Sequence, residues 1–224
     1  MFKNEYEIAS YIDHTFLKAY ASVDDLKKLC EQARNMKVKM VAINPAWVEF
    51  CKNELKDTDI HVGAAIGFPL GQNTIETKYF ETMDAIKKGA DEIDYVINIS
   101  NVKDNKYDLV KEEMQKIVSL CKENDVISKV IFENCYLNKE EIVKLSLIAK
   151  EVQPDFIKTS TGFGSGNATF EDVKLMLNNC GNVYVKAAGG IKDFTTFKKM
   201  IDLGVKRIGT SSGIQIINEF LNRK

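Results

Sequence analysis

The chain has 224 residues, which is enough for one large domain or two small ones. Its 31 lysines and arginines nearly cancel its 32 aspartates and glutamates, which excludes a strong net field favouring nucleic acid or an anionic membrane. The first residues lack the apolar run of a signal peptide, and no later run is long enough to span a bilayer. We therefore expect a cytoplasmic protein whose partners are small molecules or copies of the same chain.

Short apolar runs of β-rich composition alternate along the chain with longer amphipathic segments. Eight runs are strand candidates, at residues 11–15, 39–44, 61–68, 91–99, 127–134, 155–160, 182–188 and 205–211. Most of them are too continuously apolar for an antiparallel sheet with one solvated face, so they indicate buried parallel strands.

Helix starts are visible between these runs as a capping side chain followed three residues later by an acidic one. Three such pairs are Ser22 with Asp25, Asn138 with Glu141, and Thr169 with Asp172. Gly89 and Gly204 mark expected helix ends. Eight strands alternating with helices, without a linker, predict an α/β protein with a single (β/α)8 TIM barrel as one domain over residues 1–224. The spacing also leaves open a doubly wound open sheet.

In a barrel of this kind, active sites lie at the carboxyl ends of the strands, so polar residues late in apolar strands are candidates for function. Six residues fit this description: Asp13, Asp94, Asn98, Glu133, Lys158 and Lys186. Lys158 and Lys186 fall on consecutive predicted strands, and neighbouring strands lie about 4.8 Å apart. The two amines are therefore expected to approach each other.

Two neighbouring lysines are a poor structural arrangement but a useful catalytic one. An amine attacks a carbonyl only when it is unprotonated, and an ordinary lysine has a pKa of about 10.4. A second ammonium about 5 Å away, at an effective dielectric constant near 20, supplies roughly 3 kcal/mol against the cation, and burial adds to this. Asp94 could transfer protons or hold the second ammonium. The alternative is an ion pair between Asp94 and Lys186 that only fills the barrel.

Glycine- and serine-rich stretches follow the last three predicted strands, two of which carry Lys158 and Lys186. These stretches are "STGFGSG" at 160–166, "AAGG" at 187–190 and "GTSSG" at 209–213. They offer free backbone N–H groups and the hydroxyls of Ser211 and Ser212 near the next helix start. Loops in this part of a barrel often bind phosphate, so a phosphorylated small molecule is the expected ligand.

Seven motifs, in order and approximate spacing, carry a resemblance to a known family. They are "IDHTFLK" at 12–18, "GFPLG" at 67–71, "GADEIDYVINI" at 89–99, "KVIFENCYL" at 129–137, "DFIKTSTGFG" at 155–164, "VKAAGGIKD" at 185–193 and "RIGTSSG" at 207–213. The sequence resembles the deoxyribose-phosphate aldolases, a class I aldolase family, along nearly its whole length. The resemblance implies reversible cleavage of 2-deoxy-D-ribose 5-phosphate to D-glyceraldehyde 3-phosphate and acetaldehyde, in deoxyribose phosphate catabolism.

The resemblance also assigns roles to residues at the matching positions. Lys158 is expected to form the Schiff base, Lys186 to lower its pKa, Asp94 to transfer protons, and Asp13 to support them. Phosphate contacts are implied for Gly162, Phe163, Gly189, Gly190, Ser211 and Ser212. No cofactor and no metal is expected, and the partners are a phosphosugar substrate and, in a homodimer, a second copy of the chain. The residues alone also fit another phosphosugar TIM-barrel lyase or isomerase, or a barrel that binds a phosphometabolite without catalysis.

The remaining reactive residues are expected to have structural roles. The five cysteines are odd in number and contain no CxxC pair, so neither a disulfide framework nor a zinc site is indicated. Cys135 follows a predicted strand end but is expected to be a bystander thiol, and His14 and His61 are expected to be structural imidazoles.

Overall fold

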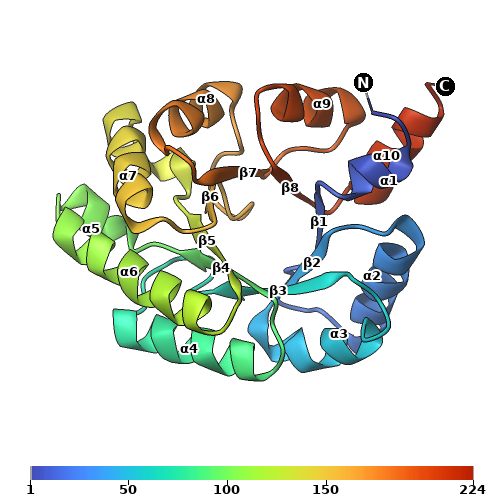
Figure 1. The fold of residues 1–224 in the computed structure, drawn as a ribbon, viewed down its shortest axis with the longest axis horizontal. Coiled ribbons are helices and arrows are strands. Elements are labelled where there is room, and N and C mark those ends of the chain that lie inside the picture. The colour runs from blue at the N-terminus through green and yellow to red at the C-terminus, as the bar shows by residue number, and fades with distance from the viewer. Residues whose placement is uncertain (1, 224) are drawn as a thin grey trace.

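A computed structural model describes residues 2–223; Met1 and Lys224, which the expected domain includes, lie outside the described residues. Eight parallel strands close into a barrel in which each strand pairs with its neighbours in sequence and β8 pairs with β1 (Figure 1). The strands are β1 (Ile12–Thr15), β2 (Met40–Ile43), β3 (His61–Ile66), β4 (Glu92–Val96), β5 (Ile127–Ile131), β6 (Phe156–Lys158), β7 (Tyr184–Ala188) and β8 (Arg207–Thr210). The predicted TIM barrel is confirmed, and the open-sheet alternative is wrong because the sheet closes.

Helices surround the barrel on its outside (Figure 1). They are α1 (Glu5–Ala9), α2 (Val23–Met36), α3 (Val48–Glu54), α4 (Ile75–Lys87), α5 (Ile99–Lys103), α6 (Tyr107–Glu123), α7 (Lys139–Val152), α8 (Phe170–Asn179), α9 (Phe194–Asp202) and α10 (Gly213–Leu221). Two 3-10 turns, η1 (Pro45–Trp47) and η2 (Asn134–Tyr136), follow β2 and β5. None of the helices within residues 2–223 combines the length and apolar character needed to cross a bilayer.

The three predicted helix starts are all confirmed. Ser22 and Asn138 form complete capping boxes at the starts of α2 and α7. At α8, Thr169 accepts the Asp172 N–H, but the Asp172 carboxylate pairs with Lys139 on α7 at 2.6 Å instead of closing the box. A neighbouring helix has therefore taken over the acidic half of this cap.

Most of the strands are shorter than the apolar runs that predicted them. β3 ends at Ile66 because Gly67 adopts a φ of +59°, and β5 is followed by Glu133 with a φ of 49°. β4 ends before Asn98, whose side chain accepts the N–H groups of Ser100 and Asn101 and so caps α5. The ends of the predicted runs thus form turns at the carboxyl ends of the strands.

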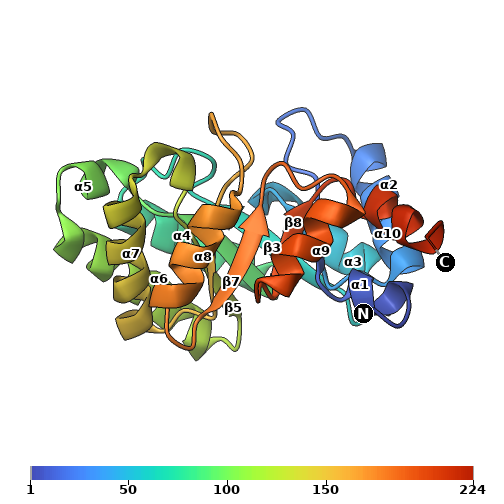
Figure 2. The same ribbon diagram turned by 90° about the horizontal axis from the view of Figure 1, so that it is seen from above.

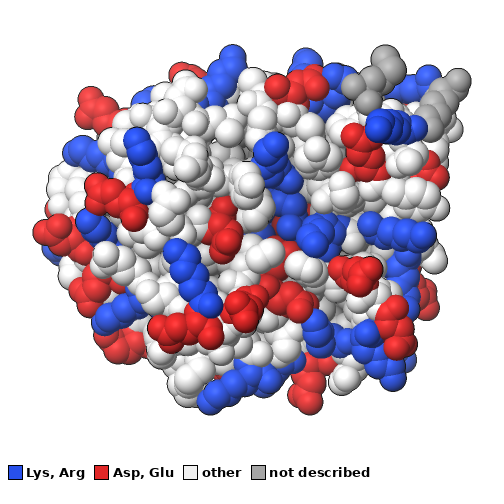
Figure 3. Space-filling view, in the orientation of Figure 1, with Lys and Arg blue, Asp and Glu red and all other residues white. Residues whose placement is uncertain are grey.

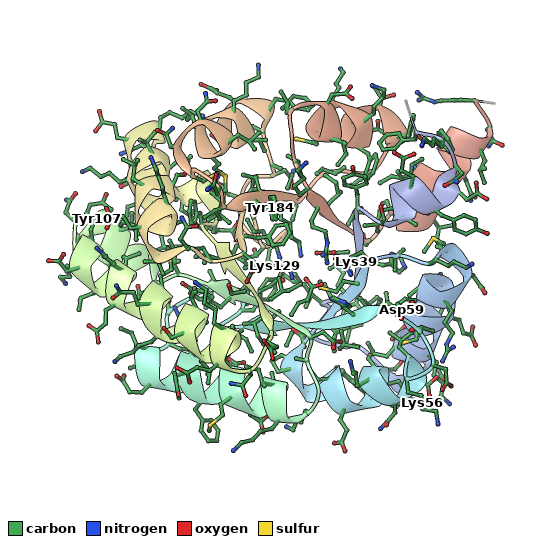
Figure 4. All side chains as sticks on the ribbon, in the orientation of Figure 1. Lys39, Lys56, Asp59, Tyr107, Lys129 and Tyr184 are labelled. Carbon is green, nitrogen blue, oxygen red and sulfur yellow. The ribbon has the colours of Figure 1, made fainter. Side chains whose placement is uncertain are left out.

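Successive residues of a strand point alternately to the two sides of the sheet. On β4, Ile93 and Tyr95 pack in the apolar layer beneath the helices, whereas Glu92 and Asp94 pair with Lys129 on β5. Figure 4 shows Lys129 inside the ring of strands. The apolar core therefore lies between the sheet and the helices, while the barrel interior holds charged side chains.

The surface carries charges of both signs. On the face shown in Figure 3, basic and acidic side chains are interspersed. This arrangement agrees with a formal net charge of −1. It gives the shown face no extended single-sign field of the kind that steers a polyanion.

A second buried ion pair lies outside the barrel. The Lys78 ammonium on α4 lies 2.6 Å from the Glu113 carboxylate on α6, and the two side chains are 0% and 1% exposed. Lys78 also donates to the Val96 carbonyl at the end of β4, at 2.7 Å. Burial lowers the pKa of Lys78 and raises the pKa of Glu113, so each group depends on the other for its charge.

We expect Lys78→Ala to lower the free energy of unfolding by about 3–5 kcal/mol, because it leaves a buried carboxylate without a cation. The matched control is Lys111→Ala, since Lys111 pairs with Glu151 at 2.6 Å while the two side chains are 39% and 62% exposed. That variant should change stability by no more than about 1 kcal/mol. Chemical denaturation measures both, and equal effects would contradict the role given to burial.

Candidate active site

Lys158 and Lys186 are paired across β6 and β7 with their Cα atoms in register. Both ammoniums donate to the same oxygen of Asp94, Oδ2, at 2.8 Å from Lys158 and 2.6 Å from Lys186. The three residues are 4%, 0% and 3% exposed. The structure thus brings together the two lysines and the carboxylate that the sequence singled out.

The same buried network extends to four further charged residues. Lys186 lies 2.5 Å from Asp13 Oδ2, and the Arg207 guanidinium lies 2.5 Å from Asp13 Oδ1 and 3.0 Å from Glu92 Oε1. Lys129 contacts Glu92 and lies 2.8 Å from Asp94 Oδ1. Asp13 therefore lies next to the second lysine of the site.

Sequence reasoning missed Glu92, Lys129 and Arg207. Each lies earlier in its strand than the strand-end residues that were considered. Signals for them exist: Glu92 stands two residues before Asp94 and so faces the same side, and Lys129 and Arg207 align with Asp94 and Lys186 in the strand register. A search for charges at alternate positions of apolar strands would have found them.

The network has an uneven charge count. Three carboxylates, Asp13, Glu92 and Asp94, face four basic groups, and three of these would suffice to balance them. The fourth is the Lys158 ammonium, which shares Asp94 with two other lysines. Because a low-dielectric interior disfavours uncompensated charge, the network is balanced when Lys158 is the neutral amine.

The pKa values follow from this arrangement. Burial lowers the pKa of Lys158 to about 8; Asp94 opposes the shift, and the ammoniums of Lys186 and Lys129 reinforce it. Burial alone would raise the pKa of Asp94, but Lys129, Lys158 and Lys186 together hold it well below its usual range. Sequence reasoning assigned the main effect on the pKa of Lys158 to the neighbouring ammonium, whereas in the structure burial is the larger cause and Lys186 adds to it.

The glycine-rich loops lie on the same face of the barrel as the lysines. In Figure 2 the β1–α2 loop and the β6–α8 loop rise from the same end of the barrel. Gly162 has a φ of +86° with open space beside it, and Gly189 and Gly190 have φ values of +86° and +75°. These conformations suit glycine and turn the backbone N–H groups away from regular pairing.

Phe163, Ser211 and Ser212 are the other residues for which phosphate contacts are predicted. Phe163 is 49% exposed and packs edge-on against Phe68 with ring centroids 5.4 Å apart, while its N–H donates to Thr161 Oγ1 at 3.0 Å. Ser211 is exposed, and Ser212 is the residue before α10 whose side chain forms no cap to that helix. Both serines therefore lie close to a helix start.

The two histidines form hydrogen bonds with other side chains. His14 pairs through Nε2 with Gln32 at 2.9 Å, and burial lowers its pKa. His61 lies at the start of β3 between Lys39, at 3.2 Å, and Glu92, at 2.7 Å. His61 therefore contacts the ion network through Glu92, near the start of the strands. In the part of the chain that the structure describes, no three His, Cys, Asp or Glu residues are placed to hold a metal.

Removing the second ammonium should change the pH dependence of Lys158. In Lys186→Leu, the pKa of Lys158 is expected to rise, because a cation is lost and the carboxylates that it held remain. Activity at neutral pH should fall and the pH optimum should move upward. The measurement is a pH–rate profile of the folded variant, and an unchanged profile with full activity would refute this role.

Replacing Lys158 by leucine and replacing Lys186 by leucine should change the free energy of unfolding in opposite directions. The pKa of Lys158 is about 8 in the fold against an ordinary 10.5, so the unfolded chain binds this proton more tightly. Lys158→Leu should therefore raise the free energy of unfolding at pH 7 by about 1–3 kcal/mol. Lys186→Leu should lower it, because Asp13 and Asp94 lose a cation.

The pH window provides the check on this stability prediction. Wild-type stability due to Lys158 rises between pH 8 and pH 10.5, so the advantage of Lys158→Leu should shrink over that interval. Urea unfolding at both ends of the window measures it. A Lys158→Leu variant less stable than the wild type at pH 7 would contradict the charge balance described above.

Comparison with known proteins agrees with the motifs in the sequence. Residues 8–218 match the DeoC/LacD family aldolase model. The chain is 59% identical over 211 residues to a deoxyribose-phosphate aldolase of Lactobacillus acidophilus, covering 94% of this chain and 89% of that protein. It is 52% identical over 219 residues to a protein of the same name from Bacteroides thetaiotaomicron, covering 97% and 92%.

A solved structure extends the agreement to three dimensions. The deoxyribose phosphate aldolase of Aeropyrum pernix, described as having a unique tetrameric structure, superimposes with a TM-score of 0.91 at 26% identity, covering 100% of this chain and 94% of that chain. The family match spans most of the chain, and the two curated relatives are more than half identical to it. The chain therefore belongs to the DeoC/LacD family of aldolases.

Proposed function

We propose that the chain is a class I aldolase that reversibly cleaves 2-deoxy-D-ribose 5-phosphate to D-glyceraldehyde 3-phosphate and acetaldehyde through a Schiff base on Lys158. The observation that carries the proposal is the buried amine with a pKa of about 8 at the end of β6, beside a second lysine and a shared carboxylate. The names of the relatives support the choice of sugar.

In the proposed reaction, the neutral Lys158 amine adds to C1 of the substrate aldehyde and the carbinolamine loses water to give an iminium ion. A base removes the proton of the C3 hydroxyl, the C2–C3 bond breaks and D-glyceraldehyde 3-phosphate leaves. The electron pair of the broken bond remains as an enamine on Lys158. Protonation of the enamine at C2 and hydrolysis of the iminium release acetaldehyde and restore the amine.

Asp94 and Lys186 have complementary roles in this scheme. Asp94 keeps its charge because the three lysines hold its pKa well below the usual range, so it offsets the fixed positive charge of the iminium. Lys186 lies 2.6 Å from Asp94 and can return a proton to the reacting atoms through an ammonium that the network holds in place. The iminium is the electron sink, so the reaction requires no metal.

The glycine and serine loops complete the proposed site by binding the phosphate. Gly162, Gly189 and Gly190 would contribute backbone N–H groups at positive φ, and Ser211 and Ser212 would contribute groups at the start of α10. Phe163 would border the phosphate in the same loop. This contact would hold the sugar with its aldehyde end toward Lys158, which is the usual contribution of a remote binding group to catalysis.

The proposed setting is deoxyribose phosphate breakdown in the cytoplasm, as the sequence led us to expect. A homodimer is the proposed minimal assembly. Exposed aromatic side chains on α4, Phe80 at 64% and Tyr79 at 38%, give this helix a surface that a second copy could cover. Analytical ultracentrifugation gives the oligomeric state directly.

The test of the covalent mechanism is reduction by borohydride. Incubation with acetaldehyde or substrate, followed by borohydride, should add one substrate-derived group within "FIKTSTGFG" and abolish activity, because reduction converts the iminium to a stable secondary amine. Lys158→Arg, which remains protonated, should fold but stay inactive and unlabelled. A label on Lys186 with Lys158 untouched would disprove the mechanism, and ligand binding without labelling or turnover would favour a binding protein.

The phosphate loops predict a preference that kinetics can measure. Wild-type kcat/KM should be at least about a hundredfold lower for deoxyribose without its phosphate. Ser212→Asp should reduce kcat/KM for the phosphorylated sugar about tenfold or more, because it places a negative charge near the dianion, and should have little effect on the unphosphorylated sugar. The control is Ser119→Asp at an exposed position on α6. Equal efficiency with both sugars would mean that these loops have another role.

A further inference from the structure

Glu133 is a buried carboxylate that the lysine network does not use. Its side chain follows β5, and the residue is 1% exposed with a left-handed φ of 49° and ψ of 62°. No lysine, arginine or histidine among residues 2–223 forms an ion pair with it. Burial of an unpaired carboxylate and left-handed backbone at a non-glycine residue both cost stability, and such costs are concentrated at functional sites.

The partners of this carboxylate all belong to the catalytic face. Glu133 Oε1 accepts the Thr161 N–H at 3.1 Å, and Oε2 accepts the Thr161 hydroxyl. Oε1 also accepts a weak hydrogen bond from the Cys135 thiol at 3.9 Å. Thr161 Oγ1 in turn accepts the N–H of Phe163 at 3.0 Å. Glu133 therefore fixes the residues on both sides of Gly162, three to five positions after the nucleophilic lysine.

Small residues allow the rest of the β6–α8 loop to pack closely against its neighbours. A Cβ atom on Gly164 would lie 2.7 Å from Cys135 Sγ, and one on Gly166 would lie 2.8 Å from Cys135 Cβ. At the other end of the loop, the Ala168 N–H donates to the Gly189 carbonyl at 3.3 Å. The loop thus connects the residues after β5 with the glycine turn after β7.

A cavity borders the β6–α8 loop beside Glu133. This cavity of about 360 Å³ is bordered by Glu133, Phe163 and Gly164 on one side and by Leu70 and Ile99 on the other. Its walls come from the loops after β3, β4, β5 and β6. Phe163 and Gly164 therefore border open space, and Glu133 lies in the same cavity wall.

We propose that Glu133 is a positioning residue that holds the β6–α8 loop through Thr161, so that Gly162 lies where the phosphate of the substrate is bound. The inference rests on the proposed function, since it assumes a phosphorylated substrate. Among the described residues, no hydrogen bond or ion pair joins Glu133 to Lys158 or Asp94, so its effect is on substrate capture and not on imine chemistry.

The experiment compares Glu133→Gln and Thr161→Val with the wild type. Each variant should raise KM for 2-deoxy-D-ribose 5-phosphate about tenfold while kcat changes less than about threefold. The kinetics with unphosphorylated deoxyribose and the rate of borohydride labelling of Lys158 by acetaldehyde should stay within about twofold of the wild type. Because both residues act through one contact, the double variant should lose no more than the worse single variant.

The matched control is Asp155→Asn. Asp155 accepts both the N–H and the hydroxyl of Ser128, each at 2.9 Å, and so repeats the Glu133 contact at the opposite end of the same two strands. This variant should leave both KM values unchanged. Thr161→Val keeps the test open if Glu133→Gln does not fold.

The other possible results distinguish failure of the Glu133 proposal from failure of the proposed function. Equal losses with both sugars, an unchanged KM for the phosphorylated sugar in the folded variants, or the same KM change in Asp155→Asn would overturn the role of Glu133. These results leave the Schiff-base mechanism standing as long as the wild type cleaves the sugar and traps acetaldehyde. A wild type that does neither would overturn the proposed function and this inference with it.

Discussion

One carboxylate shared by three lysines is the interaction on which the candidate site depends. Asp94 on β4 binds Lys129, Lys158 and Lys186, which come from the three following strands. Only a sheet with these strands in sequential order and fixed register brings the three ammoniums to one residue. The barrel therefore supplies both the burial that disfavours a cation on Lys158 and the carboxylate that opposes this effect. Lys158 is the one whose pKa this balance lowers.

The charged interior of the barrel is separate from the apolar core, and this separation allows the fold to remain stable with buried charges. The apolar residues of the strands face the helices and form a continuous core, so stability does not depend on the barrel axis alone. The axis can then hold charges that would be costly in a single mixed core. Lys78 and Glu113 show the same rule outside the barrel, where a buried pair joins two helices to the end of β4.

Much of this arrangement could be predicted from the sequence, because it depends on periodicity and on strand ends. Alternation of apolar runs with capped helices indicated the barrel, and the late polar positions identified Lys158, Lys186 and Asp94. The short helices α1 and α5 were not predicted, since five residues give little periodicity. Lys129, Glu92 and Arg207 were missed because only polar residues late in the strands were considered, although their charges within apolar runs are visible in the sequence; their partners follow from the register between strands, which the sequence does not display. The order of causes behind the Lys158 pKa also required the burial of the finished structure.

The closed charge network also constrains how the interior can vary among relatives. Changing one charged residue leaves its partners unbalanced, so an acceptable substitution at Asp13, Arg207 or Lys129 requires a compensating one on an adjoining strand. These positions should therefore covary, and the effect of each change should depend strongly on the residue opposite. Directed evolution that varies these positions singly will sample almost only inactive variants. Libraries that exchange both members of an ion pair together keep the charges balanced and can therefore yield other active networks. The surrounding apolar layer has no charges to balance, so its constraint is instead the volume and shape of the packed side chains.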